Sequence, residues 1–244
     1  MIDIKTANLN SGGGKEFAPW GFTLNPDNRC NFKCQHCFTK SSQGDFGKPA
    51  LTLEDIKSIA DQADELDVFE VDIQGGEPLM NKELFNILKA IDTSRFYTYL
   101  TSNGYFMTEE MAKKLAEAGV DRVLLSIDSF TPEEHDEFRG KKGAYERAMK
   151  AAEYVKQAGM RAFFSITIGS YNAQSKELED FTKFAASNNY GLIFNCASPS
   201  GAWKGKYDMM MSEDDTKKVE ELRSINSEII RDLWNILDSA ELIA

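Results

Sequence analysis

Six short apolar runs recur along the chain, and each has a length that suits one buried strand. They predict strands over residues 20–24, 68–74, 96–102, 122–128, 161–168 and 191–196. Between these runs, apolar residues recur at helical spacing, as they do at Ile56, Ile59, Ala63 and Leu66. Strands that alternate with helices favour a parallel sheet, because each helix returns the chain to the edge where the next strand begins.

Residues that favour caps mark the ends of several helices. Thr52, with Asp55 three positions later, forms a capping-box pattern, and Thr108 precedes a second helix that Gly119 ends. The run "TPEE" over 131–134 predicts another helix start, with proline in the first turn and glutamate at N3. The remaining helices are expected over 81–91, 143–158, 174–187 and 212–238, the last with an apolar face near Val219, Leu222, Ile225 and Leu233.

Together these elements predict an α/β fold, namely a partial (β/α)6 TIM-like barrel of parallel strands that is open on one side. Six strand–helix units fall short of the eight that close a full barrel. We expect a mobile N-terminal segment over residues 1–17, the barrel over 18–211 and a helical segment over 212–244. In such sheets the working site lies at the carboxyl ends of the strands, so residues that follow strands are the candidates for function.

Composition and charge argue against two kinds of partner. The 244 residues carry a net charge of −11, which opposes the phosphate neutralisation that nucleic-acid binding requires. Apolar runs such as "VLLSI" are too short to span a membrane, and the first residues lack the apolar stretch of a signal peptide. We therefore expect a cytoplasmic protein with no nucleic-acid and no membrane partner.

Three of the four cysteines, Cys30, Cys34 and Cys37, fall in one polar loop with the spacing C-x-x-x-C-x-x-C. Buried structural thiols do not normally gather in such a loop, and a disulfide would leave one thiol over and suits an oxidising compartment. Structural zinc needs four ligands, so His36 or the distant His135 would have to serve as the fourth. A [4Fe-4S] cluster normally takes four cysteines, and three would leave one iron open to a substrate or cofactor.

The run "CNFKCQHC" resembles the signature of the radical S-adenosylmethionine (SAM) enzymes, whose three cysteines follow the first strand of a partial barrel. His36 occupies the position that is commonly aromatic in those enzymes. A second run, "QGGEP" over 74–78, follows the second strand, and its two glycines let a ligand approach the backbone. This run resembles the family motif that holds the amino group of SAM. The resemblance covers about residues 18–210 and departs locally at Pro26 and Asp27.

The resemblance implies roles for particular residues of this chain. The three loop cysteines would hold a [4Fe-4S] cluster, and Ser126 and Asp128 would contact the ribose or methionyl part of SAM. Arg139 would pair with the SAM carboxylate, unless it is a surface arginine beside Glu137. Cys196 is expected to be a small buried residue. The full set of expected SAM-binding residues is His36, Phe38, Gly75, Gly76, Glu77, Pro78, Ser102, Asn103, Ser126, Asp128, Arg139, Ala197 and Pro199.

The reaction implied by the resemblance is reductive cleavage of SAM to methionine and a 5′-deoxyadenosyl radical, which abstracts hydrogen from a substrate. The motifs resemble most the branch that modifies peptides, with a small molecule or tetrapyrrole cofactor precursor as the alternative substrate. No cysteine follows Cys196, so this chain has no ligands for an auxiliary cluster of the SPASM or twitch type. Either the native enzyme uses one cluster, or this chain is a barrel separated from its extension. Outside this family, a non-catalytic zinc or iron–sulfur module and an electron carrier are the rival classes, although a carrier would need no "GGEP" run.

The expected partners follow from the same resemblance. They are a peptide or small-molecule substrate and an electron donor such as flavodoxin or ferredoxin. Because the N-terminal stretch is too short for a separate leader-binding domain, a peptide substrate is expected to need a leader-peptide-binding partner protein.

Overall fold

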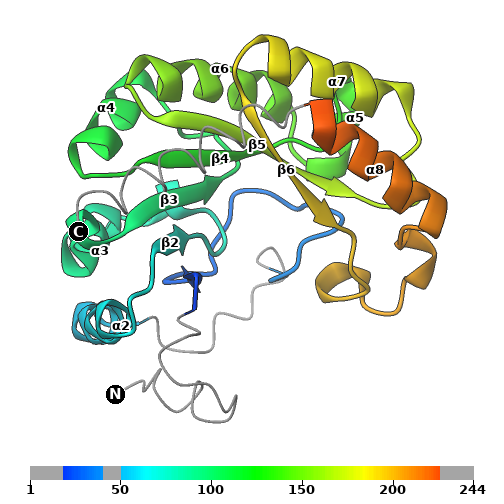
Figure 1. Ribbon diagram of the computed structural model, residues 1–244. Helices are drawn as coiled ribbons and strands as arrows, with labels where there is room; N and C mark the ends of the chain where they lie inside the picture. Colours follow the sequence, from blue (N-terminus) through cyan, green and yellow to red (C-terminus); the bar gives the residue numbers. More distant parts are fainter. Residues whose placement is uncertain (1–18, 41–50, 226–244) are drawn as a thin grey trace.

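The computed structural model describes residues 19–40 and 51–225. Within them, six strands form one parallel sheet in the order in which they occur along the chain, so β1 and β6 are its two edges (Figure 1). The partial (β/α)6 barrel that the sequence predicts is therefore confirmed. The strands are β1 (Gly21–Leu24), β2 (Glu70–Ile73), β3 (Tyr97–Ser102), β4 (Arg122–Ser126), β5 (Arg161–Ile168) and β6 (Gly191–Cys196).

The helices lie along the outer side of the curved sheet (Figure 1). They are α2 (Leu53–Glu65), α3 (Leu84–Ile91), α4 (Glu109–Glu117), α5 (Pro132–Arg139), α6 (Ala144–Gln157), α7 (Lys176–Ser187) and α8 (Glu213–Ile225). Short 3₁₀ turns are η3 (Pro78–Met80), η4 (Thr93–Arg95), η5 (Gly201–Trp203) and η6 (Tyr207–Met209). The expected N-terminal segment 1–17 and the end of the expected C-terminal helix, beyond residue 225, lie outside the described residues.

The predicted caps of α2 and α4 are present. The Thr52 hydroxyl accepts a hydrogen bond from the amide of Asp55, whose carboxylate in turn accepts one from the amide of Thr52. Thr108 accepts a hydrogen bond from the amide of Met111 at the start of α4, and Gly119 follows that helix with φ of 81°. These local contacts stabilise each helix end without help from the rest of the fold.

Helix α5 begins where the sequence predicts, but its first turn is held by a distant residue. The side chain of Thr131 makes no capping hydrogen bond. Instead, Glu177 at the start of α7 accepts hydrogen bonds from the amides of Phe130 and Thr131 and from the hydroxyl of Ser129. These bonds therefore fix the loop between β4 and α5 to α7, which follows β5 in the sequence.

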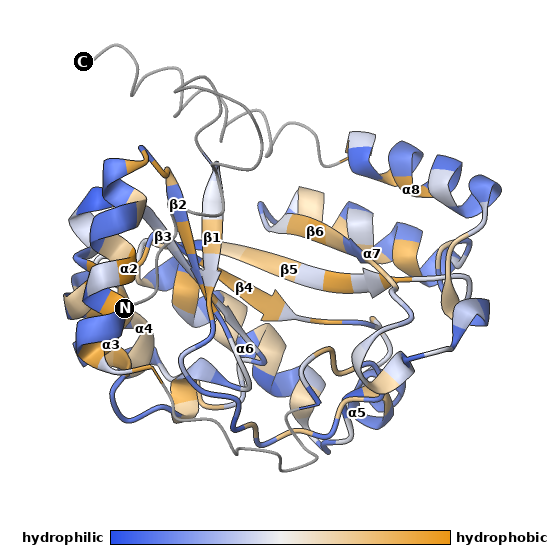
Figure 2. Ribbon diagram, turned by 90° about the horizontal axis from the view of Figure 1, so that it is seen from below, coloured by the Kyte–Doolittle hydropathy of each residue, from blue (hydrophilic) through white to orange (hydrophobic). Residues whose placement is uncertain are grey.

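The main apolar core lies between the sheet and the helices. In Figure 2, β4 and β5 are largely hydrophobic, whereas the helices carry hydrophilic residues as well. Ile56, Ile59 and Ala63 are buried, as the helical spacing predicts. Val219 and Leu222 of α8 are also buried, but Ile225 is 38% exposed, so its expected place on the apolar face was wrong.

The side of the sheet that faces the barrel interior carries a row of polar residues. One residue from each of the first four strands lies in register with the next, in the row Thr23, Asp72, Tyr99 and Arg122. The guanidinium of Arg122 lies 4.1 Å from the centre of the Tyr99 ring, a distance typical of cation–π contacts. This lining places hydrogen-bonding groups inside the barrel. In the described part of the chain, no helix is long and apolar enough to cross a membrane.

Candidate active site

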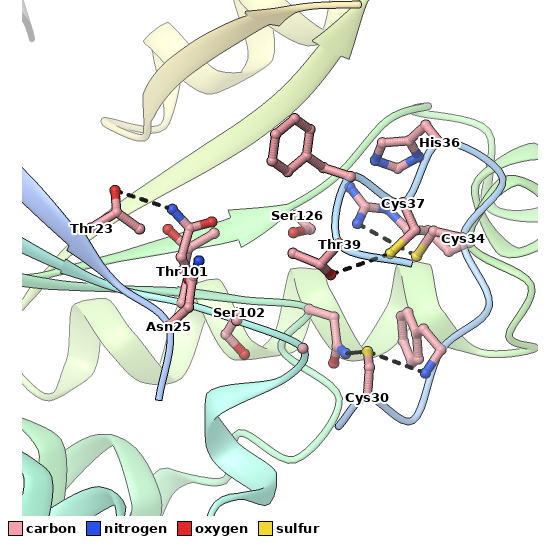
Figure 3. A pocket seen from close by; sticks show the side chains of 17 residues that line it. Thr23, Asn25, Cys30, Cys34, His36, Cys37, Thr39, Thr101, Ser102 and Ser126 are labelled. Atoms are coloured by element: carbon pink, nitrogen blue, oxygen red, sulfur yellow. Dashed lines mark hydrogen bonds between the residues drawn. The ribbon is translucent and has the colours of Figure 1, made fainter. Parts of the chain in front are cut away.

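A cavity of about 460 Å³ opens at the carboxyl ends of the strands, where the sequence places the working site (Figure 3). The cysteine loop, residues 30–37, forms one side of it. Most of the expected site residues meet there: Cys30, Cys34, His36, Cys37, Phe38, Gly75, Gly76, Ser102, Asn103, Ser126 and Arg139. Five expected residues do not line it: Glu77, Pro78, Asp128, Ala197 and Pro199. Six lining residues were not expected: Thr23, Asn25, Phe32, Thr39, Gln74 and Thr101.

Residues 75–77 hold the backbone of the segment that leads into the cysteine loop. The amide of Gly76 donates to the carbonyl of Asp27 at 2.9 Å, and the amide of Glu77 donates to the carbonyl of Arg29 at 2.8 Å. A Cβ atom at Gly76 would lie 2.1 Å from the Arg29 carbonyl oxygen, and one at Gly75 would lie 2.2 Å from that of Asp27. The glycines are therefore required by the approach of the loop, a reason that the sequence alone did not reveal.

Two further segments hold the rest of the cysteine loop in the same way. At the end of α5, the carbonyls of Phe138 and Arg139 accept hydrogen bonds from the amides of Gln35 and Lys33. After β6, the amide of Ala202 donates to the carbonyl of Cys37 at 3.0 Å. Each segment contains a glycine with positive φ, Gly140 or Gly201, whose missing side chain leaves room for a loop carbonyl. The loop is thus positioned by backbone contacts from three distant parts of the barrel.

Each loop sulfur lies beside a hydrogen-bonding group (Figure 3). The amide of Phe32 and the side-chain amide of Asn103 donate to the sulfur of Cys30 at 3.4 and 3.9 Å. Arg139 Nη1 donates to the sulfur of Cys34 at 3.9 Å. The Thr39 hydroxyl lies 3.6 Å from the sulfur of Cys37. Hydrogen bonds of this kind stabilise negative charge on sulfur, as in a bound thiolate.

Burial controls the protonation of these thiols when they are unligated. It is the main cause that raises the pKa of Cys30 to about 11, and it also raises the pKa of Cys34. Both groups are therefore protonated at neutral pH, and metal ligation has to displace their protons.

His36 belongs to a group of aromatic rings at the edge of the cavity. Its ring stacks on Phe138 with centres 4.8 Å apart, and Trp203 and Tyr171 complete the group. Burial, with the charge of Arg139, lowers the pKa of His36 to about 4, so the imidazole is neutral. Its buried Nδ1 has no hydrogen-bond partner among residues 19–40 and 51–225.

Glu77 is turned away from the cavity into the protein. Its carboxylate accepts hydrogen bonds from the hydroxyl of Ser102 at 2.7 Å and from the amides of Asn103 and Leu79 at 2.8 and 3.1 Å. These bonds join the turn after β2 to the end of β3. The carboxylate thereby supports two residues that line the cavity, Ser102 and Asn103.

Asp128 and Arg139 form a buried ion pair, with Nε and Oδ2 2.5 Å apart. This burial excludes the surface position that was one alternative for Arg139. Ser126, two residues before Asp128, does line the cavity. Ala197 is buried and donates its amide to the carbonyl of Ile168, and Pro199 is half-buried nearby.

Two sequence expectations about single residues are resolved by exposure and contacts. Cys196 at the end of β6 is exposed, so the expectation that it is buried was wrong. Asn195 and Cys196 still pair with β5, but β6 is an edge of the sheet and these last two residues are exposed. His135 is 1% exposed, and its Nδ1 accepts a hydrogen bond from the amide of Asp128. His135 does not line the cavity, and so it is not placed to complete a zinc site with the loop cysteines.

The arrangement of the thiols around one cavity can be compared with what an iron–sulfur cluster and a single metal ion require. Zinc–sulfur bonds of about 2.3 Å require the ligands of one ion to converge on a point. Among residues 19–40 and 51–225, no three His, Cys, Asp or Glu side chains are arranged to hold one ion. Thiolates of a [4Fe-4S] cluster bind different irons, and so they surround a volume. The three cysteines around one cavity fit that requirement.

Comparisons with known proteins identify the family. Residues 24–185 match the family described as the radical SAM superfamily. An AdoMet-dependent heme synthase of Oleidesulfovibrio alaskensis is 32% identical over 139 residues, or 57% of this chain and 36% of that protein. The mycofactocin maturase MftC of Mycolicibacterium smegmatis is 29% identical over 180 residues, or 73% of this chain and 45% of that protein. The chain therefore spans less than half the length of these relatives.

Solved structures show the same fold. Streptococcus suis SuiB bound to S-adenosylmethionine aligns with a TM-score of 0.69 at 20% identity, over 88% of this chain and 48% of SuiB. The enzyme anSMEcpe with bound AdoMet aligns with a TM-score of 0.64 at 25% identity, over 82% of this chain and 58% of that one. The family match covers well over half of the chain and includes the three-cysteine loop. The chain belongs to the radical SAM superfamily.

Proposed function

We propose that this chain holds a [4Fe-4S] cluster on Cys30, Cys34 and Cys37, binds SAM in the adjoining cavity and modifies a peptide. Together, the cluster and SAM would supply a 5′-deoxyadenosyl radical that abstracts hydrogen from the substrate. The protein's own contribution is to fix the cysteine loop by backbone contacts and to line the cavity with polar groups. Neutral His36, Ser102, Asn103 and Ser126 are the groups available to orient SAM.

The wall opposite the cysteines is the observation that carries the proposal of a peptide substrate. Figure 3 shows Thr23, Asn25 and Thr101 across the cavity from Cys34, Cys37 and His36. With Gln74 they form a wall of hydroxyl and amide groups without charge. The amide nitrogen of Gln74 donates to Asp72 at 2.8 Å and to Thr23 at 3.4 Å, which leaves its oxygen as an acceptor. Such a wall complements the amide groups of a peptide.

The charge of the cavity counts against the tetrapyrrole alternative. Tetrapyrrole precursors carry several carboxylates, which proteins recognise with arginine or lysine. Among the described residues that line the cavity, Arg139 is the one lysine or arginine, and it is already paired with Asp128. The relatives include both kinds of enzyme, since PqqA peptide cyclase of Granulibacter bethesdensis is 28% identical over 157 residues. The cavity therefore favours the peptide-modifying relatives.

The test is an anaerobic assay for the products of SAM cleavage. The reconstituted chain would receive SAM and dithionite, with either a pool of short peptides of mixed sequence or iron coproporphyrin III. We expect 5′-deoxyadenosine to form, to increase with the peptides and to disappear in Cys34→Ala. If the yield of 5′-deoxyadenosine increased with iron coproporphyrin III and not with the peptides, the proposed substrate would be a tetrapyrrole instead of a peptide. A full cluster that yields no 5′-deoxyadenosine under any of these conditions would refute the proposed reaction.

A further inference from the structure

The buried ion pair of Asp128 and Arg139 lies directly behind the cysteine loop. The side chains are 1% and 9% exposed, respectively. Burial alone would raise the pKa of Asp128, but the charge of Arg139 lowers it, and a guanidinium stays protonated in proteins. Both groups are therefore charged, and in a buried site their charges are weakly screened by solvent.

Contacts from two neighbouring elements fix the position of Asp128. Its Oδ1 accepts a hydrogen bond from the amide of Thr167 in β5 at 3.0 Å. Its own amide donates to Nδ1 of His135 in α5 at 3.2 Å. Burial is the main cause that lowers the pKa of His135 to about 4, so the imidazole is neutral and able to accept this bond. The carboxylate is thus held in place before any ligand binds.

Arg139 extends from Asp128 to the cysteine loop. While Nε faces the carboxylate, Nη1 donates to the sulfur of Cys34 at 3.9 Å. The backbone carbonyl of Arg139 also accepts a hydrogen bond from the amide of Lys33, next to Cys34 in the chain. Cys30 and Cys37, by contrast, have neutral hydrogen-bonding partners. Cys34 is therefore the one loop cysteine whose sulfur has a described contact with a formal positive charge.

We propose that Arg139 is a positioning residue that raises the reduction potential of the cluster through Cys34, and that Asp128 orients it and offsets part of its charge. Reduction takes one electron from an external reductant and adds one negative charge to the cluster. A buried cation that donates a hydrogen bond to a ligand sulfur stabilises the reduced form more than the oxidised form. The buried carboxylate pairs with the guanidinium at Nε and carries the opposite charge, so it has the opposite effect.

This proposal predicts shifts of opposite sign for the two partners. In Arg139→Gln the reduced form loses its stabilising charge, so the midpoint potential should fall. A tenfold loss in the reduced-to-oxidised ratio at the wild-type midpoint corresponds to 59 mV for one electron, and we expect a shift of about that size. In Asp128→Asn the cation is no longer offset, so the potential should rise. Arg139→Lys keeps the charge without the planar fork and should give an intermediate value.

The experiment is a redox titration of the reconstituted chain followed by electron paramagnetic resonance, without SAM. Leaving SAM out separates an effect on the cluster from an effect on SAM binding. Arg29→Gln is the matched control, because Arg29 lies next to Cys30 in the chain but is 59% exposed and pairs with Asp27. Solvent screens such a charge, so this variant should keep the wild-type potential.

The results separate this inference from the cofactor assignment on which it rests. Opposite shifts in Arg139→Gln and Asp128→Asn, with Arg29→Gln unchanged, would support the proposal. Equal potentials in all loaded variants, or shifts of the same sign, would overturn it. If Arg139→Gln fails to bind iron and sulfide, the potentials of Arg139→Lys and Asp128→Asn test the proposal instead. A midpoint potential in Asp128→Asn that is no higher than that of the wild type would then overturn it. Wild-type chain that binds no iron or sulfide would instead refute the cluster itself.

Discussion

A methyl group at Gly201 should disturb the cysteine loop more than the same group four residues later. A Cβ atom at Gly201 would lie 2.5 Å from the carbonyl oxygens of Cys37 and Phe38. At Gly205 no heavy atom of the described residues lies within 4 Å of the corresponding position. Both glycines have positive φ, 57° and 84°, so each alanine variant carries a similar backbone strain of about 1 kcal/mol. The two variants therefore differ mainly in the steric conflict with the loop.

The size of this difference follows from the contacts that must change. To relieve the conflict, the Cys37 carbonyl has to move away from Ala202, whose amide donates to it at 3.0 Å. Losing that hydrogen bond costs about 1 kcal/mol, and relieving an overpacked contact typically costs a further 1–3 kcal/mol. A difference of about 3 kcal/mol corresponds to about a hundredfold change in an equilibrium constant. We expect cluster binding by Gly201→Ala to be weakened by about that factor relative to Gly205→Ala.

The assay is anaerobic titration of each variant with ferrous iron and sulfide against a competing iron chelator. Circular dichroism of the unloaded chains checks that both variants keep the fold. Gly140→Ala and Gly143→Ala provide a second pair, because a Cβ at Gly140 would lie 2.7 Å from the Lys33 carbonyl, whereas Gly143 has open space. Equal cluster loading within both pairs would refute the conclusion that backbone contacts set the shape of the loop.

Three further predictions concern single polar residues. Glu77→Gln should lower the free energy of unfolding in urea by about 2 kcal/mol, because an amide nitrogen replaces one of the two carboxylate oxygens that together accept three hydrogen bonds. A loss well under about 1 kcal/mol would contradict the role given to Glu77. Burial raises the pKa of Asp72 to about 6 in the folded chain. As the pH rises, this carboxyl therefore ionises in the unfolded chain before it ionises in the folded chain. The free energy of unfolding should fall by about 3 kcal/mol between pH 4 and 6. Asp72→Asn should flatten that decline in urea unfolding, and parallel pH profiles would show that Asp72 is not its source. Cys196→Ser should leave iron content and 5′-deoxyadenosine yield unchanged, because Cys196 is exposed and does not line the cavity; a loss of either would assign it a role.

Local signals in the sequence predicted the secondary-structure elements and the location of the site. They did not predict the contacts between residues that are far apart in the chain. The capping pair Thr52 and Asp55 and the cysteine spacing depend on residues a few positions apart, and the structure shows both. The cap of α5 comes instead from Glu177, 46 positions after Thr131. Nothing in the spacing of Asp128 and Arg139 indicates that they pair with each other. These residues become partners only when the tertiary fold brings their elements together. The periodicity of one helix or strand does not indicate which elements those are.

The hydroxyl and amide wall of the cavity could have been found from the sequence with one further step. Thr23, Gln74 and Thr101 stand at the ends of neighbouring predicted strands, where parallel strands bring their side chains together. The reason for Gly75 and Gly76 was less accessible, because it depends on where the chain from Asp27 to Arg29 passes. Only the folded backbone shows that approach.

The way the cysteine loop is held has a consequence for protein engineering. A nonapeptide "CNFKCQHCF" grafted into another scaffold would carry the three thiols but not the segments that bend it. The recipient would also need a glycine turn after a neighbouring strand, a helix that ends in a left-handed glycine, and a returning segment with another. In turn, Lys33 and Gln35 contribute their backbone amides to the described contacts, so a designer should be able to vary their side chains and keep the loop's shape.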